Sequence, residues 1–266
     1  RVANKNLLSD GTLYVAKYNE DGTGEWIPLV YGQGELTEVN GFTSQADVLI
    51  RTRAAGDAVG ATRMDRPEDI EPSPRDGKVY VALTNNTRRG ADDTDAANPR
   101  GPNRYGHIIE MQEDGKDAAA TSFTWNIFLL CGDPGNPDHG TFFAGFDQSK
   151  VSPISAPDNV VFDRDGNLWI GTDGQPGTLG FNDALHAVPV EGPNRGFLRQ
   201  FLSVPTGAEN CGPEFTYDYK TAFSAVQHPG DNGTLEEPTS SFPDGSTPPR
   251  PSVVTVGKKD GGIIGR

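Results

Sequence analysis

RPEDIEPSPRDGKVYVA, at residues 66–82, places a proline and an acidic residue before a short strand, an Asp-Gly turn and an apolar strand. The stretch APDNVVFDRDGNLWIG at 156–171 repeats this order. GPEFTYDYKTAFSA at 212–225 repeats it again, with Asp218 and Tyr219 in the turn. Asp-Gly favours the two-residue hairpin turns that require a positive φ. Each stretch therefore predicts an antiparallel hairpin, and the repetition predicts a fold made of repeated hairpins.

Such a hairpin is typical of the two inner strands of a β-propeller blade, in which the first strand lines the central channel. At ~40–45 residues per blade, the spacing of the three stretches leaves room for about three to five blades. A closed ring of six blades would need more sequence. We therefore predict an all-β fold and a β-propeller that is incomplete in this chain. Residues 1–266 are expected to form a single propeller domain or part of one.

Short runs of β-branched and aromatic residues, bounded by turn residues, predict the strands of these hairpins and several others. These runs lie at 12–18, 47–52, 78–84, 107–111, 123–130, 159–162, 167–171, 184–189, 221–226 and 252–257. No segment of useful length has convincing helical periodicity. The 33 glycines and 21 prolines indicate abundant turns and disfavour a helical bundle.

The charge and the apolar runs exclude two classes of partner. Asp and Glu number 37 against 23 Lys and Arg, and the net charge of −14 argues against nucleic acid, whose phosphates require clustered cations. The longest apolar run, residues 125–131, is far shorter than the ~20 residues of a membrane helix, so we predict no membrane span. No signal peptide is visible at the start of the chain.

The three repeated stretches each place an acidic residue directly after the proline: Glu68, Asp158 and Glu214. Equivalent positions on inner strands face one axis, so three carboxylates are expected to converge. Convergent carboxylates shift their pKa or recruit a cation. Calcium accepts six to eight oxygen ligands, including amide oxygens such as that of Asn159. The alternative is that these acids bind backbone N–H groups at the blade entrances.

Arg66 lies two residues before Glu68, and residues i and i+2 of a strand share a face. Its guanidinium would therefore point into the same channel, where it could bind a phosphate or carboxylate with two parallel hydrogen bonds. The alternative is a structural ion pair with Glu68 or Asp69. No Gly-x-Ser-x-Gly motif and no P-loop motif occurs, which disfavours a serine hydrolase and a nucleotide-binding loop.

The histidines and cysteines give weaker signals. His107 and His228 have no metal-type spacing and are predicted to be core or turn residues hydrogen-bonded to the backbone. Cys131 and Cys211 are too few for a disulfide framework. One bridge, two free thiols and one thiolate ligand are all compatible with this pair. Cys211 is near enough to Glu214 in sequence to reach the site, although a buried inert thiol is the simpler interpretation.

Eleven motifs follow one another along the chain: GTLYVAK at 11–17, MDRPE at 64–68, LTNN at 83–86, DAANPR at 95–100, YGHI at 105–108, APDN at 156–159, GTDG at 171–174, GAE at 207–209, GP at 212–213, QHPG at 227–230 and DGGIIG at 260–265. In this order they resemble the motifs of the PhoX-type bacterial alkaline phosphatases. The resemblance extends over nearly the whole chain.

This resemblance implies a six-bladed propeller with an iron–calcium cluster (Fe³⁺ and Ca²⁺) at one end of its axis. It also implies the hydrolysis of phosphomonoesters to inorganic phosphate, and a secreted or periplasmic enzyme of phosphate acquisition that is exported by a twin-arginine signal. Arg66 matches the arginine that binds substrate phosphate, and Glu68 and Asp158 match metal ligands; Asn159 and Glu214 are further metal-ligand candidates.

The chain corresponds only to the C-terminal portion of these phosphatases. The iron-binding cysteine and another acidic ligand of the family lie upstream of any residue in this chain, and neither Cys131 nor Cys211 occupies that position. An N-terminal segment or a second chain is therefore expected to complete the propeller and the metal site.

Two other functions use similar residues. A calcium-dependent propeller lactonase also has axial Glu, Asn and Asp, but a phosphate-binding arginine has no clear place in lactone hydrolysis. A non-catalytic propeller scaffold stabilised by calcium would bind metal without turning over any ester. Arg66 therefore favours the phosphatase.

Overall fold

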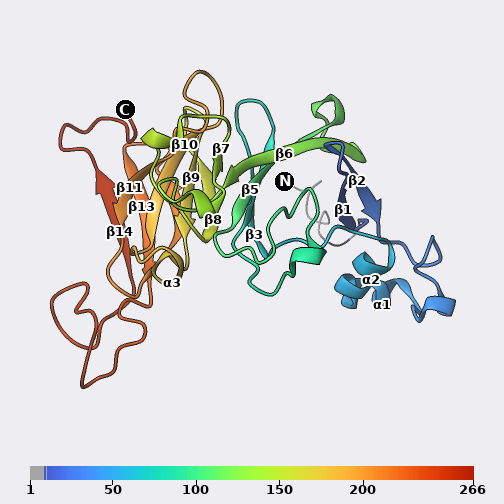
Figure 1. Ribbon diagram of the computed structural model, residues 1–266, viewed down its shortest axis with the longest axis horizontal. Helices are drawn as coiled ribbons and strands as arrows, with labels where there is room; N and C mark the ends of the chain where they lie inside the picture. Colours follow the sequence, from blue (N-terminus) through green and yellow to red (C-terminus); the bar gives the residue numbers. More distant parts are fainter. Residues whose placement is uncertain (1–8, 10) are drawn as a thin grey trace. The chain divides into compact units, whose positions relative to one another are not determined.

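The computed structural model describes residues 9 and 11–266. These residues form two compact units: the first contains residues 9, 11–64, 95–97 and 111–125, and the second contains 65–94, 98–110 and 126–266. Strands dominate the described chain, and its few helices are short (Figure 1). The all-β prediction is confirmed. The prediction of one domain over residues 1–266 stays a prediction.

The first unit is built on a small antiparallel sheet. Strand β1 (Tyr14–Tyr18) pairs with β2 (Thr23–Pro28), and β2 pairs with the first residues of β6 (Ser122–Leu130). Two short helices, α1 (Gln45–Ile50) and α2 (Thr52–Ala58), follow the hairpin.

The prediction of a strand at residues 47–52 is wrong, because this segment belongs to α1 and the start of α2. The Ser44 side chain accepts a hydrogen bond from the Asp47 N–H at 3.1 Å, which is a helix N-cap. Val48 and Ala55 are fully buried against Leu29. Capping and one-sided burial therefore outweigh the β-branched residues of the segment.

The second unit contains three sheets. The first has β3 (Pro67–Pro72) and β4 (Val79–Leu83), followed by residues 107–110 of β5 (His107–Glu113) and residues 126–130 of β6, with the short strand β7 (Phe142–Phe143) paired to β6.

The second sheet has the order β11-β10-β9-β8 and is fully antiparallel. Its strands are β8 (Pro157–Phe162), β9 (Asn167–Thr172), β10 (Ala184–Pro189) and β11 (Arg199–Ser203). The single-turn helix α3 (Gln175–Thr178) lies between β9 and β10.

The third sheet has the order β12-β13-β14. Its strands are β12 (Glu209–Phe215), β13 (Thr221–Gln227) and β14 (Ser252–Gly257). Five short 3-10 turns complete the described elements, at residues 38–40, 91–93, 114–116, 137–139 and 148–150.

The three predicted hairpins are the β3–β4, β8–β9 and β12–β13 pairs. Their first strands are neighbours in the order β3, β8, β12. Buried aromatic and aliphatic residues pack behind these strands; Trp169 packs with Leu185, Ala222 and Ile264 between the second and third sheets. The repeated hairpins thus place three equivalent strands side by side, and β3 and β8 start beside predicted site residues, Glu68 and Asp158.

No helix in the described part of the chain is long and apolar enough to cross a membrane. Both cysteines are free thiols, Cys131 buried and Cys211 half-buried. Burial raises the pKa of Cys131 to about 12, so this thiol stays protonated.

Candidate functional site

A β-bulge interrupts the first strand of each predicted hairpin, at the start of β3 and β8 and in the middle of β12. The pairing register shifts between Pro67 and Ile70 in β3, and between Pro157 and Val160 in β8. A bulge inserts an extra residue and re-aims the neighbouring side chains. Glu68 and Asp158 both lie within these bulges, so their side chains do not follow the regular alternation of the strands.

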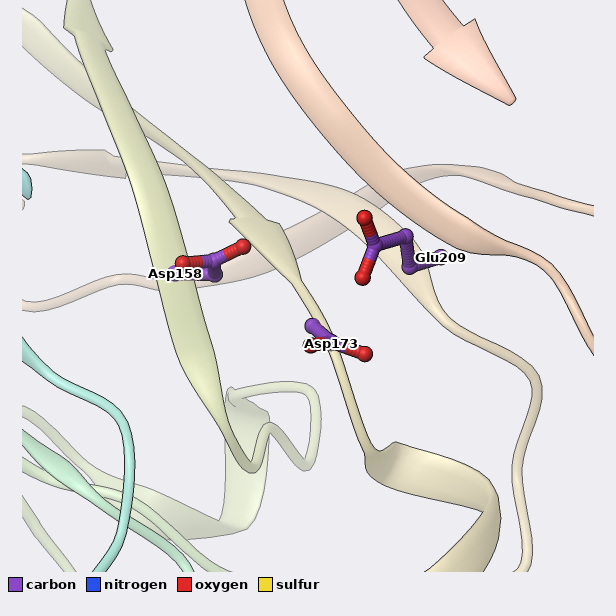
Figure 2. Close-up of side chains that lie close together, drawn as sticks. All are labelled: Asp158, Asp173 and Glu209. Carbon is purple, nitrogen blue, oxygen red and sulfur yellow. The ribbon is translucent and has the colours of Figure 1, made fainter. Parts of the chain in front are cut away.

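Three carboxylates meet next to the second bulge (Figure 2). Asp158 lies on β8, Asp173 directly follows β9, and Glu209 begins β12. One oxygen from each lies within 4.8 Å of the others, and Figure 2 shows the three carboxylates facing a common space. Asp173 is exposed, Asp158 half-buried and Glu209 buried. This carboxylate cluster, Asp158, Asp173 and Glu209, is the centre of the candidate site.

The electrostatics of the cluster are unfavourable without a cation. Burial, and then the charges of Glu68 and Glu209, raise the pKa of Asp158 to about 6. Burial and the adjacent Glu209 carboxylate raise the pKa of Asp173 to about 7. Like charges at such short range favour protonation or the binding of a cation. Oxygen donors of this kind are the ligands that hard cations such as Ca²⁺ prefer, so the donor set is suited to one.

A buried carboxylate, Asp183, fixes the turn that carries Asp173. It accepts hydrogen bonds from the Thr172 hydroxyl at 2.6 Å and from the N–H groups of Gly174 and Gln175 at 3.0 Å. These donors flank Asp173 on both sides. The hydrogen bonds from these neighbours to Asp183 therefore fix the position of Asp173.

Arg66 lies beside the first bulge and is held by two acceptors. Its guanidinium donates to Glu68 Oε1 at 3.1 Å and to Asn85 Oδ1 at 3.3 Å. Its positive charge lowers the pKa of Asp158, against the larger raising effects of burial and of Glu68. The charges of Arg66 and Glu68 both act on Asp158, so these three residues lie in one electrostatic environment; their roles at the site stay predictions.

The backbone at Arg66 is unusual, because its φ of 52° lies in the left-handed region. Ala156, at the same place in the second hairpin, has a φ of 50°. The preceding residue, Asp65, is fully buried and forms an ion pair with Arg89 at 2.6 Å and a hydrogen bond with Asn103 at 2.9 Å. This buried network anchors the chain where the strained backbone begins.

Asn159 and Glu214 occupy places different from those of the cluster residues. The Asn159 side chain accepts a hydrogen bond from the Gly212 N–H at 2.7 Å and so connects β8 to β12. Glu214 pairs with Phe223, two pairs from its turn, which is the register of Glu71 rather than of Glu68. Burial and the charges of Asp69 and Glu214 raise the pKa of Glu71, so the charge of Glu214 influences Glu71. Both residues stay predictions as metal ligands.

The third hairpin differs because its bulge lies one pair nearer the turn. The register shifts between Cys211 and Glu214, so Cys211 occupies the level at which the other two hairpins have their bulged acids. Matching the proline-acid pairs in sequence therefore misplaces this strand. Burial and Glu209 raise the pKa of Cys211, which keeps a protonated thiol beside the cluster.

Two members of the cluster, Asp173 and Glu209, were not predicted as site residues. Both lie inside motifs of the resemblance, GTDG and GAE, but neither follows a proline. Strand pairing supplies the missing signal for Asp173: Pro157 pairs with Thr172 at the open end of the hairpin, and Asp158 and Asp173 are each one residue away from this pair. Glu209 could be identified as a site residue only from the pairing register of β12.

Comparison with known proteins agrees with these features. The family model described as alkaline phosphatase PhoX matches residues 1–230. The structure is similar to that of Pseudomonas fluorescens PhoX in complex with vanadate, a transition state analogue, with a TM-score of 0.86 and 39% sequence identity. No curated protein sequence gives a significant match.

The match to the Pseudomonas fluorescens protein covers 98% of this chain and 47% of that one, so this chain spans about half the length of its relative. The structural similarity confirms the β-propeller class. The resemblance inferred from the sequence motifs is also confirmed, and the chain belongs to the PhoX alkaline phosphatase family.

Proposed function

We propose that this chain is the portion of a metal-dependent alkaline phosphatase that carries the substrate arginine and part of the metal site. The observation that carries this proposal is the carboxylate cluster, with one oxygen each from Asp158, Asp173 and Glu209 within 4.8 Å, beside Arg66. Family membership supplies the reaction class, hydrolysis of phosphomonoesters to inorganic phosphate. The vanadate bound to the Pseudomonas fluorescens protein supports a phosphate-like substrate.

The proposed cofactors are calcium and iron (Fe³⁺). Asp158, Asp173 and Glu209 would provide hard oxygen ligands, with Glu68, Asn159 and Glu214 as the further candidates that the sequence predicts. When bound, the metal ions supply Lewis-acid stabilisation of the phosphate oxygens.

The chain's own residues would bind and orient the substrate. The Arg66 side chain is 60% exposed, so its remaining N–H groups are available to a phosphate oxygen. Glu68 and Asn85 hold the guanidinium from the protein side, which fixes the direction of those donors. Charge-assisted hydrogen bonds from arginine to phosphate are among the stronger ones in proteins.

The remaining chain and the location are proposed from the family. The described sheets, together with the 47% coverage of the relative, support a propeller completed by an N-terminal segment or a second chain. A secreted or periplasmic location, reached through a twin-arginine signal, is proposed on family membership alone.

The test is hydrolysis of p-nitrophenyl phosphate by the full-length native polypeptide, with calcium and iron content measured on the same samples. Asp173→Asn is expected to lose bound metal and to reduce the turnover by at least ~100-fold, since a ligand of the metal is removed. Asp138→Asn, at an exposed position, is the matched control and should leave both unchanged. Wild-type turnover and metal content in Asp173→Asn would overturn the assignment.

A further inference from the structure

Glu209 is the buried member of the carboxylate cluster, and each of its two oxygens meets a side chain from outside the cluster. The Cys211 thiol donates a hydrogen bond to Oε1, with a sulfur–oxygen distance of 2.8 Å. The Nε2 atom of His228 lies 3.5 Å from Oε2. Glu209 itself is only 7% exposed. The carboxylate is therefore held between a thiol and an imidazole.

Cys211 reaches Glu209 because of its place on the strand. The two residues are separated by one position on β12, so their side chains share a face. The bulge of this hairpin begins only after Cys211, so the regular alternation is kept from Glu209 to Cys211. A bulge one pair earlier, as in the other two hairpins, would turn this side chain away.

His228 reaches Glu209 from the neighbouring strand. It follows the last residue of β13, Gln227, which pairs with Glu209 across the sheet. Its φ of 33° is left-handed, an unfavourable conformation for a residue with a side chain. The ring lies with Nδ1 3.4 Å from the Gly207 carbonyl oxygen and Nε2 toward Glu209. Strained backbone of this kind persists where surrounding contacts hold it, and it is concentrated at functional sites.

We infer that Cys211 and His228 are positioning residues that fix the Glu209 carboxylate for metal binding, an inference that rests on the proposed metal site. A glutamate has three side-chain torsions, and repulsion from Asp173 would turn an unheld carboxylate away from the cluster. Holding it in the folded protein removes that reorganisation from the binding step. Outer groups of this kind commonly change metal affinity by about 10- to 100-fold when they are removed.

The experiment measures calcium binding to the full-length native polypeptide at a series of buffered free Ca²⁺ concentrations, with iron content determined on the same samples. Cys211→Ala and His228→Ala each remove one contact. Cys211→Ser keeps a hydroxyl donor and His228→Gln keeps an amide donor, so these two are the matched controls. The thermal unfolding of the metal-free proteins is recorded in parallel.

We expect the two alanine variants to bind metal about 10- to 100-fold more weakly, and the two conservative variants to recover most of the affinity. In a Glu209→Gln background the alanine substitutions should have no further effect, because they act through that carboxylate. A merely structural role would instead lower the unfolding temperature of the metal-free protein and leave its metal affinity unchanged.

The outcomes separate this inference from the proposed function. Wild-type metal binding in Glu209→Gln would overturn the assignment of Glu209 to the metal site, and the inference with it. Weak binding in Glu209→Gln, combined with wild-type affinity in both alanine variants, would leave the metal site intact and overturn the positioning role of Cys211 and His228.

Discussion

The Asn159 side chain accepts a hydrogen bond from the Gly212 backbone N–H, 2.7 Å away on the neighbouring inner strand. The same connection occurs one hairpin earlier, where Asp69 Oδ2 accepts from the Val160 N–H at 2.9 Å. In each case the third residue after the left-handed position accepts a hydrogen bond from a backbone N–H at the bulge of the next strand. Hydrogen bonds therefore connect the bulges that orient the site residues to one another.

Removing one such bridge should weaken the fold without removing a charge. Asn159→Ala is expected to lower the free energy of unfolding by about 1 kcal/mol, because the Gly212 N–H loses its protein acceptor. Urea denaturation of the metal-free protein measures this. Asn159→Asp retains an acceptor oxygen and serves as the control. Unchanged stability in Asn159→Ala together with lost metal binding would identify Asn159 as a ligand instead.

Substitutions of Asp183 and Asp173 should have different effects on stability and on calcium affinity. Asp183→Ala leaves three donors around the turn without their acceptor, so both the unfolding temperature and the calcium affinity are expected to fall. Asp173→Asn should weaken calcium binding while it stabilises the metal-free fold, because it removes a repelling charge. The two variants are compared by thermal unfolding and calcium titration. Equal stability losses in both would contradict this division.

Arg66→Ala is expected to lower kcat/KM for p-nitrophenyl phosphate by about 10- to 100-fold, the usual cost of a lost hydrogen bond to a charged group. Calcium and iron content should stay at the wild-type level, since Arg66 is not a ligand. Asn85→Ala, which frees only one side of the guanidinium, should have a smaller effect. Unchanged kinetics in Arg66→Ala would show that this residue does not bind the substrate.

The metal-free protein should become less stable as the pH rises from 5 to 8. The folded-state pKa values of Asp158 and Asp173, about 6 and about 7, lie above that of an unfolded aspartate. Their stabilising protonated forms are therefore present at low pH and lost as the pH rises through these values. Thermal unfolding after chelation, with Asp173→Asn as the comparison, tests this. A pH profile that is identical in the variant would exclude Asp173 as the cause.

His186 should have the opposite effect at acidic pH. It is fully buried on β10, and burial lowers the pKa of its imidazole to about 4. Between the unfolded pKa of ~6.5 and this value, only the unfolded chain binds the proton, so stability falls as the pH falls. The loss between pH 7 and 4 is expected to reach roughly 3 kcal/mol. Urea denaturation of wild type and His186→Gln measures it, and the variant should lose less stability over this range.

The repeated hairpins could be predicted from sequence because each carries local signals. Proline, an acidic residue and an Asp-Gly turn act within about ten residues, and they place Glu68 and Asp158 in equivalent bulges. Arg66 follows from the same pattern. These parts of the fold and the site depend on short-range preferences that a single sequence contains.

The parts of the fold and the site that could not be predicted depend on strand register and on tertiary burial. The bulge of the third hairpin lies one pair nearer the turn, a shift that the sequence motif does not encode, and it exchanges Glu214 for Cys211 at the level of the site. Asp173 and Glu209 join the cluster only through strand pairing. The helix at Gln45–Ile50 was missed because its capping by Ser44 and its burial outweigh β-propensity.

The left-handed backbone of Arg66 has a consequence for the evolution of this chain. Glycine would adopt the φ of 52° without steric cost, whereas an arginine costs roughly 1–2 kcal/mol there. Ala156, at the same place in the next hairpin, carries a comparable penalty with only a methyl group. The chain therefore gives up part of its folding free energy to keep a guanidinium beside Glu68, where its charge acts on Asp158. Replacing Arg66 with glycine would therefore stabilise the fold and lower the turnover.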